Sequence, residues 1–144
     1  MMDVEVSVNM GTLATLDTEL AGKVDYICRD SAFAVEKKAK LLCIRDTGAC
    51  KASIYTVTSK GADYSQNCAD AEAKAASRGK KITLLPQAHL SSKIEALVSV
   101  GVNYGLWLEL GLRRKAGPAP FMIPAMDSQR SAFVEACNAV LGRL

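Results

Sequence analysis

The sequence lacks any run of about 18 apolar residues, so no membrane-spanning helix is expected. Its first ten residues, MMDVEVSVNM, carry acids where a secretory signal would carry lysines, and no apolar core follows them. The five cysteines show no repeated short spacing, which argues against a disulfide framework and against a zinc site. These absences predict a soluble, intracellular protein with reduced thiols, in which Cys28, Cys43 and Cys137 are small buried hydrophobes.

Side chains suited to catalysis are also scarce. The one histidine, His89, lies in polar surroundings, and no local signature surrounds Cys50, so a thiol hydrolase built on this pair is not favoured. The net charge of +3 is milder than that of a typical nucleic-acid binder. A small nucleic-acid-binding module that uses the cations Lys74, Arg78, Lys80 and Lys81 stays an alternative, although no known reader motif accompanies them.

The residues that are present predict one globular domain over 1–144. Apolar residues make up 49% of the chain and charged residues 23%, which is typical of a folded domain. Alternation at Val4, Val6 and Val8 predicts a strand. A long helix is expected after Thr12, since apolar residues recur three or four apart as far as Leu42. Its charged residues off that stripe are Glu36, Lys37, Lys38 and Lys40.

The second half of the chain predicts further strands and a terminal helix. Residues 53–59 are rich in β-branched and aromatic side chains, and residues 96–102 alternate, so both indicate strands. A variable loop region at about 60–93 is expected to hold a short helix over 69–77 and a short strand at 81–85. A C-terminal helix is expected from near Asp127 or Ser128. The sum is an α+β fold: a small, mainly antiparallel sheet packed against a long N-terminal helix and a C-terminal helix.

An aromatic segment and a basic turn follow the clearest strand. Tyr104 and Trp107 are candidates for an assembly interface, with core packing as the alternative for Trp107. Glu109 is either an outward strand position or a partnered carboxylate. The segment that follows contains Pro118, Pro120 and Pro124, which we expect to exclude a regular helix over 118–124. Phe121 and Met122, which lie between these prolines, are interpreted as an anchor in the core.

The cations Arg113, Arg114 and Lys115 predict an exposed loop. In the plainer interpretation this loop is a solvated surface. In the sharper one, a ring of such loops lines a DNA conduit or docks on an acidic neighbour, because about six copies would multiply the local charge.

The motifs of the chain occur in a fixed order: a valine strand, a long helix, Asp46-Thr47-Gly48, a strand, GVNY at 101–104, Glu109-x-Gly111, Pro120-Phe121-x-x-Pro124-Ala125 and a terminal helix. This order and spacing resemble the tail-completion (head–tail joining, neck) family of long-tailed bacteriophages, outside residues 61–92. The chain departs from residues common in that family at Ile44-Arg45, Leu112 and Ile123.

This resemblance implies a non-enzymatic virion protein that forms a ring at the head–tail junction or at the tail end. The implied location is the neck or tail of the virion, and the host cytoplasm during assembly. The implied partners are further copies in a ring of about six subunits, neighbouring neck or tail-tube proteins and, through non-specific contact, packaged DNA. No membrane, cofactor or metal is expected.

Residues 41–49 also resemble the Asp-Thr-Gly-Ala segment of retroviral-type aspartic proteases, in which two aspartates share a proton and activate water. That chemistry needs an aspartate on a turn that follows an apolar strand. Here the preceding residues have helical periodicity, and Arg45 directly precedes Asp46. We therefore expect a structural turn in which Gly48 can take backbone angles that other residues resist, with the protease as the alternative.

Overall fold

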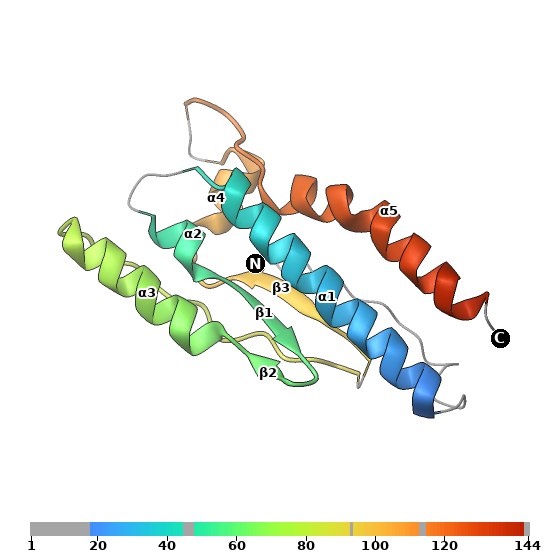
Figure 1. The fold of residues 1–144 in the computed structure, drawn as a ribbon. Helices are drawn as coiled ribbons and strands as arrows, with labels where there is room; N and C mark the ends of the chain where they lie inside the picture. Colours follow the sequence, from blue (N-terminus) through green and yellow to red (C-terminus); the bar gives the residue numbers. More distant parts are fainter. Residues whose placement is uncertain (1–17, 45–47, 93, 113–114, 143–144) are drawn as a thin grey trace.

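The computed structural model of the protein describes residues 18–44, 48–92, 94–112 and 115–142 (Figure 1). A small antiparallel sheet packs against a long N-terminal helix and a C-terminal helix, which confirms the predicted α+β class. No helix within these residues is long and apolar enough to cross a membrane. The elements in chain order are α1 (Thr18–Leu42), α2 (Ala49–Ser53), β1 (Ile54–Thr58), β2 (Gly61–Ala62), α3 (Tyr64–Ser77), β3 (Leu97–Val100), α4 (Gly105–Leu110) and α5 (Met122–Leu141).

The sheet has the strand order β2-β1-β3, with antiparallel pairing on both sides of β1. Ile54 lies opposite Val100 in β3, and Val57 lies opposite Ala62 in β2. The strands predicted at 53–59 and 96–102 are confirmed as β1 and β3. The strand predicted at Val4 to Val8 lies outside the described residues.

The strand predicted at 81–85 forms only a single bridge, between Leu84 and Val102. Pro86 follows directly and has no N–H to extend a ladder. The helix predicted over 69–77 is confirmed as α3, but it begins earlier, at Tyr64. His89 is exposed, as expected.

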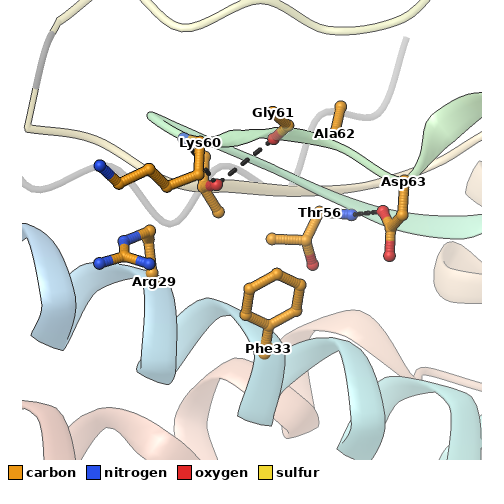
Figure 2. A pocket seen from close by; sticks show the side chains of 8 residues that line it. Arg29, Phe33, Thr56, Lys60, Gly61, Ala62 and Asp63 are labelled. Atoms are coloured by element: carbon orange, nitrogen blue, oxygen red, sulfur yellow. Dashed lines mark hydrogen bonds between the residues drawn. The ribbon is translucent and has the colours of Figure 1, made fainter.

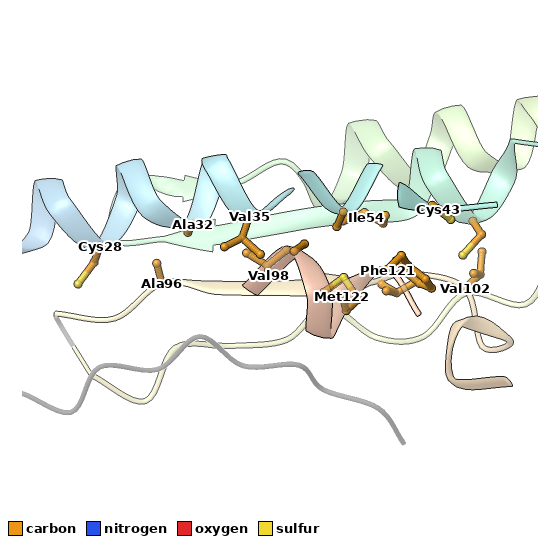
Figure 3. Close-up of a cluster of buried hydrophobic side chains, with 14 of the residues drawn as sticks. Cys28, Ala32, Val35, Cys43, Ile54, Ala96, Val98, Val102, Phe121 and Met122 are labelled. Atoms are coloured by element: carbon orange, nitrogen blue, oxygen red, sulfur yellow. The ribbon is translucent and has the colours of Figure 1, made fainter. Parts of the chain in front are cut away.

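Both faces of β1 and β3 are covered, which is why every residue of the two strands is buried. On one face, Ile54 and Val98 pack with α1 and with the start of α5 in the main core (Figure 3). On the other face lies a smaller cluster of Tyr55, Val57 and Leu97, against which Tyr64, Ala88 and Leu90 pack. The sheet is therefore the middle layer of the fold.

α1 and α5 lie side by side and run in opposite directions (Figure 1). The long helix predicted from the apolar stripe is confirmed as α1, although its predicted start after Thr12 lies outside the described residues. α5 begins at Met122, so the predicted start near Asp127 is wrong. Pro124 lies in the first turn of α5, where backbone N–H groups have no partner within the helix, and a proline is tolerated there. The prediction that Pro124 excludes a regular helix is therefore also wrong.

Glu36 was expected to lie off the apolar stripe, but the structure buries it between α1 and β1. Its carboxylate accepts hydrogen bonds from the Thr56 hydroxyl at 3.0 Å and from the Asn67 amide at 3.0 Å, and it forms an ion pair with Lys40 at 3.1 Å. The Asn67 amide also donates to the Ile54 carbonyl at 2.7 Å. Because a buried carboxylate needs such partners, this network joins α1, β1 and α3 at one point.

Candidate functional site

The aromatic segment after β3 forms a short helix, α4, instead of a strand. Glu109, for which an outward strand position was one interpretation, is only 3% exposed. The alternative interpretation, a partnered carboxylate, is confirmed by three hydrogen bonds. Glu109 Oε2 accepts from the backbone N–H groups of Phe121 at 2.8 Å and Met122 at 3.0 Å, and Oε1 accepts from the N–H of Ile123 at 2.9 Å.

Glu109 therefore caps the N-terminus of α5 from a neighbouring helix. The first N–H groups of a helix have no intrahelical acceptor, and a negative charge there is also favoured by the helix dipole. The next residue, Pro124, has no N–H to satisfy. The sequence indicates this role only in part. A glutamate among large apolar residues needs hydrogen-bond donors if it is buried, but no local pattern identifies donors 12 to 14 residues away.

The loop between α4 and α5 has a fixed base. Gly111 has a φ of 75°, and a Cβ added there would lie 2.5 Å from the backbone nitrogen of Pro118, so only glycine fits this close approach. The Ala119 N–H donates to the Leu108 carbonyl at 2.8 Å, which ties the returning chain to α4. Phe121 is 0% exposed, so its predicted role as a core anchor is confirmed, as is that of Met122.

Beyond this base the described part of the loop is exposed. Leu112, Lys115 and Ala116 all face solvent, as predicted for a basic loop. Arg113 and Arg114 lie outside the described residues. Tyr104 and Trp107 are both half-buried, and Tyr104 packs against the main core.

Exposed apolar side chains gather at the same end of the molecule. Figure 1 shows that the end of α1, α4 and the start of α5 lie together there. Ten large hydrophobic side chains are exposed among the described residues, and six of them lie in these segments or within two residues of them. We call this set the α4 end, and its members are Leu41, Leu42, Ile44, Leu110, Leu112 and Ile123. Such a concentration is typical of a surface that another protein covers.

Gly48 has a φ of 84°, a backbone angle that residues other than glycine rarely adopt. Gly48 lies between the end of α1 at Leu42 and the start of α2 at Ala49, and the apolar stripe up to Leu42 is helical, as its periodicity predicts. An aspartic protease would instead need a strand before this turn. Asp46 and Thr47, the other residues of the motif, lie outside the described residues.

The four cations of the alternative nucleic-acid module are all exposed. They follow one another near the C-terminal end of α3, and the Lys74 side chain lies beside Gly48, 3.4 Å from the position of an added Cβ. They therefore form a second basic region, separate in sequence from the loop with Lys115.

A shallow groove of about 300 Å³ lies between α1 and the β1–β2 hairpin (Figure 2). Phe33 and Arg29 line it from α1, and Lys60 lines it from the hairpin. Asp63 also lines it and accepts a hydrogen bond from the Thr56 N–H at 2.7 Å. Arg29 is already paired with Asp25 at 3.2 Å. The groove has side chains of both charges around one aromatic ring. The α4 end instead combines exposed apolar side chains with a loop whose base is fixed. We therefore take the α4 end as the candidate site.

Within the described residues no group of three or more histidine, cysteine or acidic side chains is placed to hold a metal ion. The comparisons with known proteins find no matching family model, no matching curated protein and no matching solved structure.

Proposed function

We propose that the protein is a non-enzymatic structural component of a tailed-phage virion, which assembles as a ring of about six copies at the head–tail junction or tail end. Its partners in this proposal are adjacent copies of itself and neighbouring neck or tail-tube proteins. The order of motifs from Asp46 to Ala125 supports the proposal through the resemblance stated above.

The structural observation that carries the proposal is the exposed apolar surface of the α4 end. Burying apolar surface contributes about 25 cal/mol per Å², and stable interfaces bury about 800 Å² on each partner. Leu110 and Leu112 stand beside a loop whose base is fixed by Glu109 and Phe121. A rigid base lowers the entropy cost of binding, because little of the surface must be ordered on contact.

The basic loop adds a second feature to this surface. Arg113, Arg114 and Lys115 contribute three positive charges per copy, so that about six copies would bring about eighteen charges together. Such a ring of charge would attract an acidic neighbour or the phosphates of packaged DNA.

The particle that contains the chain provides the direct test. Cryo-electron microscopy should place several copies around the axis of the neck or at the end of the tail. A single asymmetric copy at the neck, or absence from purified particles, would overturn the proposal. Solution size alone is a weaker test, since the isolated chain can stay monomeric until its neighbouring ring is present.

Apolar exposure is tested by a matched pair of double variants. Leu110→Ser with Leu112→Ser should leave the fold intact and lower the yield of joined particles at least tenfold, because an interface loses apolar contact. Val134→Ser with Leu141→Ser changes two residues of α5 that are also exposed but lie outside the α4 end, and this variant should leave the yield near that of the wild type. Equal yields from the two variants would remove the α4 end from the proposed interface.

The charge of the loop is tested in the same way. Replacing Arg113, Arg114 and Lys115 by serine should keep the melting temperature and increase the proportion of unjoined heads and tails in micrographs. The control replaces Arg78, Lys80 and Lys81, three exposed cations near the end of α3. If the control reduces joining and the loop variant does not, the charged contact belongs to the second basic region.

The protease alternative makes an opposite prediction for Asp46. Asp46→Asn should assemble normally if this residue is part of a structural turn, because asparagine forms similar local hydrogen bonds. Peptide cleavage by the wild type that pepstatin inhibits, and that Asp46→Asn lacks, would replace the structural proposal by the protease.

A further inference from the structure

The groove between α1 and the β1–β2 hairpin has side chains of opposite charge toward its two ends (Figure 2). Asp63 lies toward one end, and Lys60 and Arg29 lie toward the other. The Phe33 ring, which is 47% exposed, lies between these ends. Arg29 is already paired with Asp25 through Nε at 3.2 Å. Within the residues that the structure describes no ion pair involves Lys60, so its ammonium group is available to an acid.

The negative end of the groove is held in place by the sheet. Asp63 Oδ1 accepts a hydrogen bond from the Thr56 N–H at 2.7 Å, and the Thr56 hydroxyl donates to Glu36 at 3.0 Å. Lys40 is paired with Glu36 at 3.1 Å and compensates its charge. Asp63 therefore gives this end a negative charge at a fixed position on the hairpin.

β2 is the edge strand beside the groove, and its outer side is free to pair. No strand of the described residues lies beyond it in the sheet. The Asp63 N–H donates to the Thr56 carbonyl at 3.3 Å, toward β1. Because inward and outward backbone groups alternate along an antiparallel strand, the N–H and C=O of the preceding residue, Ala62, point away from β1. Ala62 is exposed, and an unpaired edge of this kind is a template for a further strand.

The face of β2 toward α1 has room for a side chain from an added strand. Gly61 lies opposite Thr58, whose side chain lines the groove. Residues opposite each other in a sheet project to the same face, so at this position the edge strand has no side chain toward α1. A Cβ added at Gly61 would have no atom within 4 Å beyond its chain neighbours, so the space there is open.

We propose that this groove is a docking surface for an extended segment of a partner protein, which adds to the free edge of β2. We expect antiparallel pairing, because antiparallel ladders are the more stable kind. β2 runs from the Lys60 end of the groove to the Asp63 end, so the segment begins beside Asp63. Every second side chain of a strand points to the same face. The segment therefore carries a cation near Asp63, an apolar residue over Phe33 two positions later, and an acid near Lys60 after two more.

The length of the groove and the sequence of the chain both fit this occupant. Lys60 and Asp63 are three residues apart, which is about 10 Å along a strand, and the first and fifth residues of a strand are about 13 Å apart. Long charged side chains cover the difference. No lysine or arginine of the chain is followed four residues later by an aspartate or glutamate, so a second copy does not supply the segment. The proposal therefore does not depend on the ring-forming function.

Two blocked pentapeptides of equal composition test the order of the charges. The matching peptide is acetyl-Lys-Thr-Ile-Thr-Glu-amide, and the control, acetyl-Glu-Thr-Ile-Thr-Lys-amide, brings like charges together at both ends. Each is titrated into the isotope-labelled full-length chain and followed by NMR. The matching peptide should shift the amide signals of Phe33, Gly61 and Ala62 and bind about tenfold more tightly than the control, because cross-strand charge pairs attract or repel. Equal affinities, tighter binding of the control, or shifts confined to other parts of the chain would overturn the proposal.

Charge reversal tests which residue binds the acid. In Lys60→Glu one end of the groove should favour each peptide, so most of the preference for the matching peptide should be lost. Lys81→Glu is the matched control, because it makes the same charge change at an exposed residue near the end of α3 and should keep the preference. If Lys60→Glu kept the full preference, the acid would not bind at Lys60 and the proposed orientation would be wrong.

The aromatic wall and the size of the occupant are tested last. Phe33→Ala should weaken binding of the matching peptide severalfold, whereas Leu41→Ala, at another exposed apolar residue of α1, should not. Free lysine or free glutamate that shifted the same signals at the dissociation constant of the peptide would show a site for small molecules instead, and would also overturn the proposal. The comparison of the two peptides uses the wild-type chain alone, so it stands even if a variant fails to fold.

Discussion

Two buried carboxylates, Glu109 and Glu36, contribute to the fold in different ways. Glu109 is at the α4 end, where its two oxygens accept hydrogen bonds from three consecutive backbone N–H groups at the start of α5. Glu36 is buried between α1 and β1, where a hydroxyl, an amide and a lysine from three elements surround it. The first carboxylate completes one helix, whereas the second connects α1, β1 and α3.

Glu36 and Glu109 also differ in whether their partners are charged side chains or backbone groups. The Glu36 carboxylate lies close to Lys40, and burial followed by a hydrogen bond with Asp63 raises the pKa of its carboxyl. All the hydrogen bonds that the structure gives to Glu109 come from backbone groups whose dipoles are fixed by α5. A carboxylate bound by backbone donors fixes the path of the chain, and here it fixes the point from which the basic loop leaves the body.

The largest effect is expected at Phe121, which anchors the start of α5 in the core, and not at Glu109, which caps it. Phe121→Ala should lower the free energy of unfolding by about 3–5 kcal/mol, because a fully buried ring is lost and a cavity remains. Urea unfolding monitored by circular dichroism gives this value. Phe33→Ala, at an exposed position of α1, is the matched control and should cost less than about 1 kcal/mol. Similar losses in the two variants would mean that the start of α5 is not anchored in the core.

The next effect tests the cap itself. Glu109→Ala leaves three N–H groups of α5 without an acceptor and should cost about 2–4 kcal/mol, since each unsatisfied buried donor costs about 1–3 kcal/mol before water enters. Glu109→Gln keeps one acceptor oxygen and should lose about half as much. Glu135→Ala, an exposed glutamate of the same helix, should change stability by less than about 0.5 kcal/mol. If Glu109→Ala matched this control, the comparison between the two carboxylates would fail.

The sequence identifies the parts of this fold that depend on local periodicity. The apolar stripe predicted α1, the β-branched residues predicted β1, and the alternation at 96–102 predicted β3. Phe121 was also recognised as an anchor, because a large aromatic residue between prolines has few other roles. In the loop beside the candidate site, the exposure of Lys115 follows from its charge. The special backbone angle of Gly48, between α1 and α2, follows from turn chemistry.

The remaining features depend on contacts between residues far apart in the chain. α5 begins five residues before Asp127, because an acceptor on α4 satisfies its first N–H groups, and no pattern near Met122 indicates that acceptor. Glu36 is four residues after buried Ala32, so its helical position borders the apolar stripe, but its donors come from β1 and α3.

The smallest expected effect is a pH dependence of stability that comes from Glu36. Because its pKa is raised in the folded state, the folded protein binds this proton more tightly than the unfolded chain does. The contribution to stability is therefore complete below the ordinary glutamate pKa of about 4.3 and is lost as the pH rises through the raised value. Glu36→Gln removes this dependence, so its melting temperature relative to the wild type should increase as the pH rises across that window. Lys40→Met removes a charge that lowers the pKa of Glu36 and should extend the window to higher pH. A constant difference between Glu36→Gln and the wild type at every pH would show that folding does not raise the pKa of Glu36.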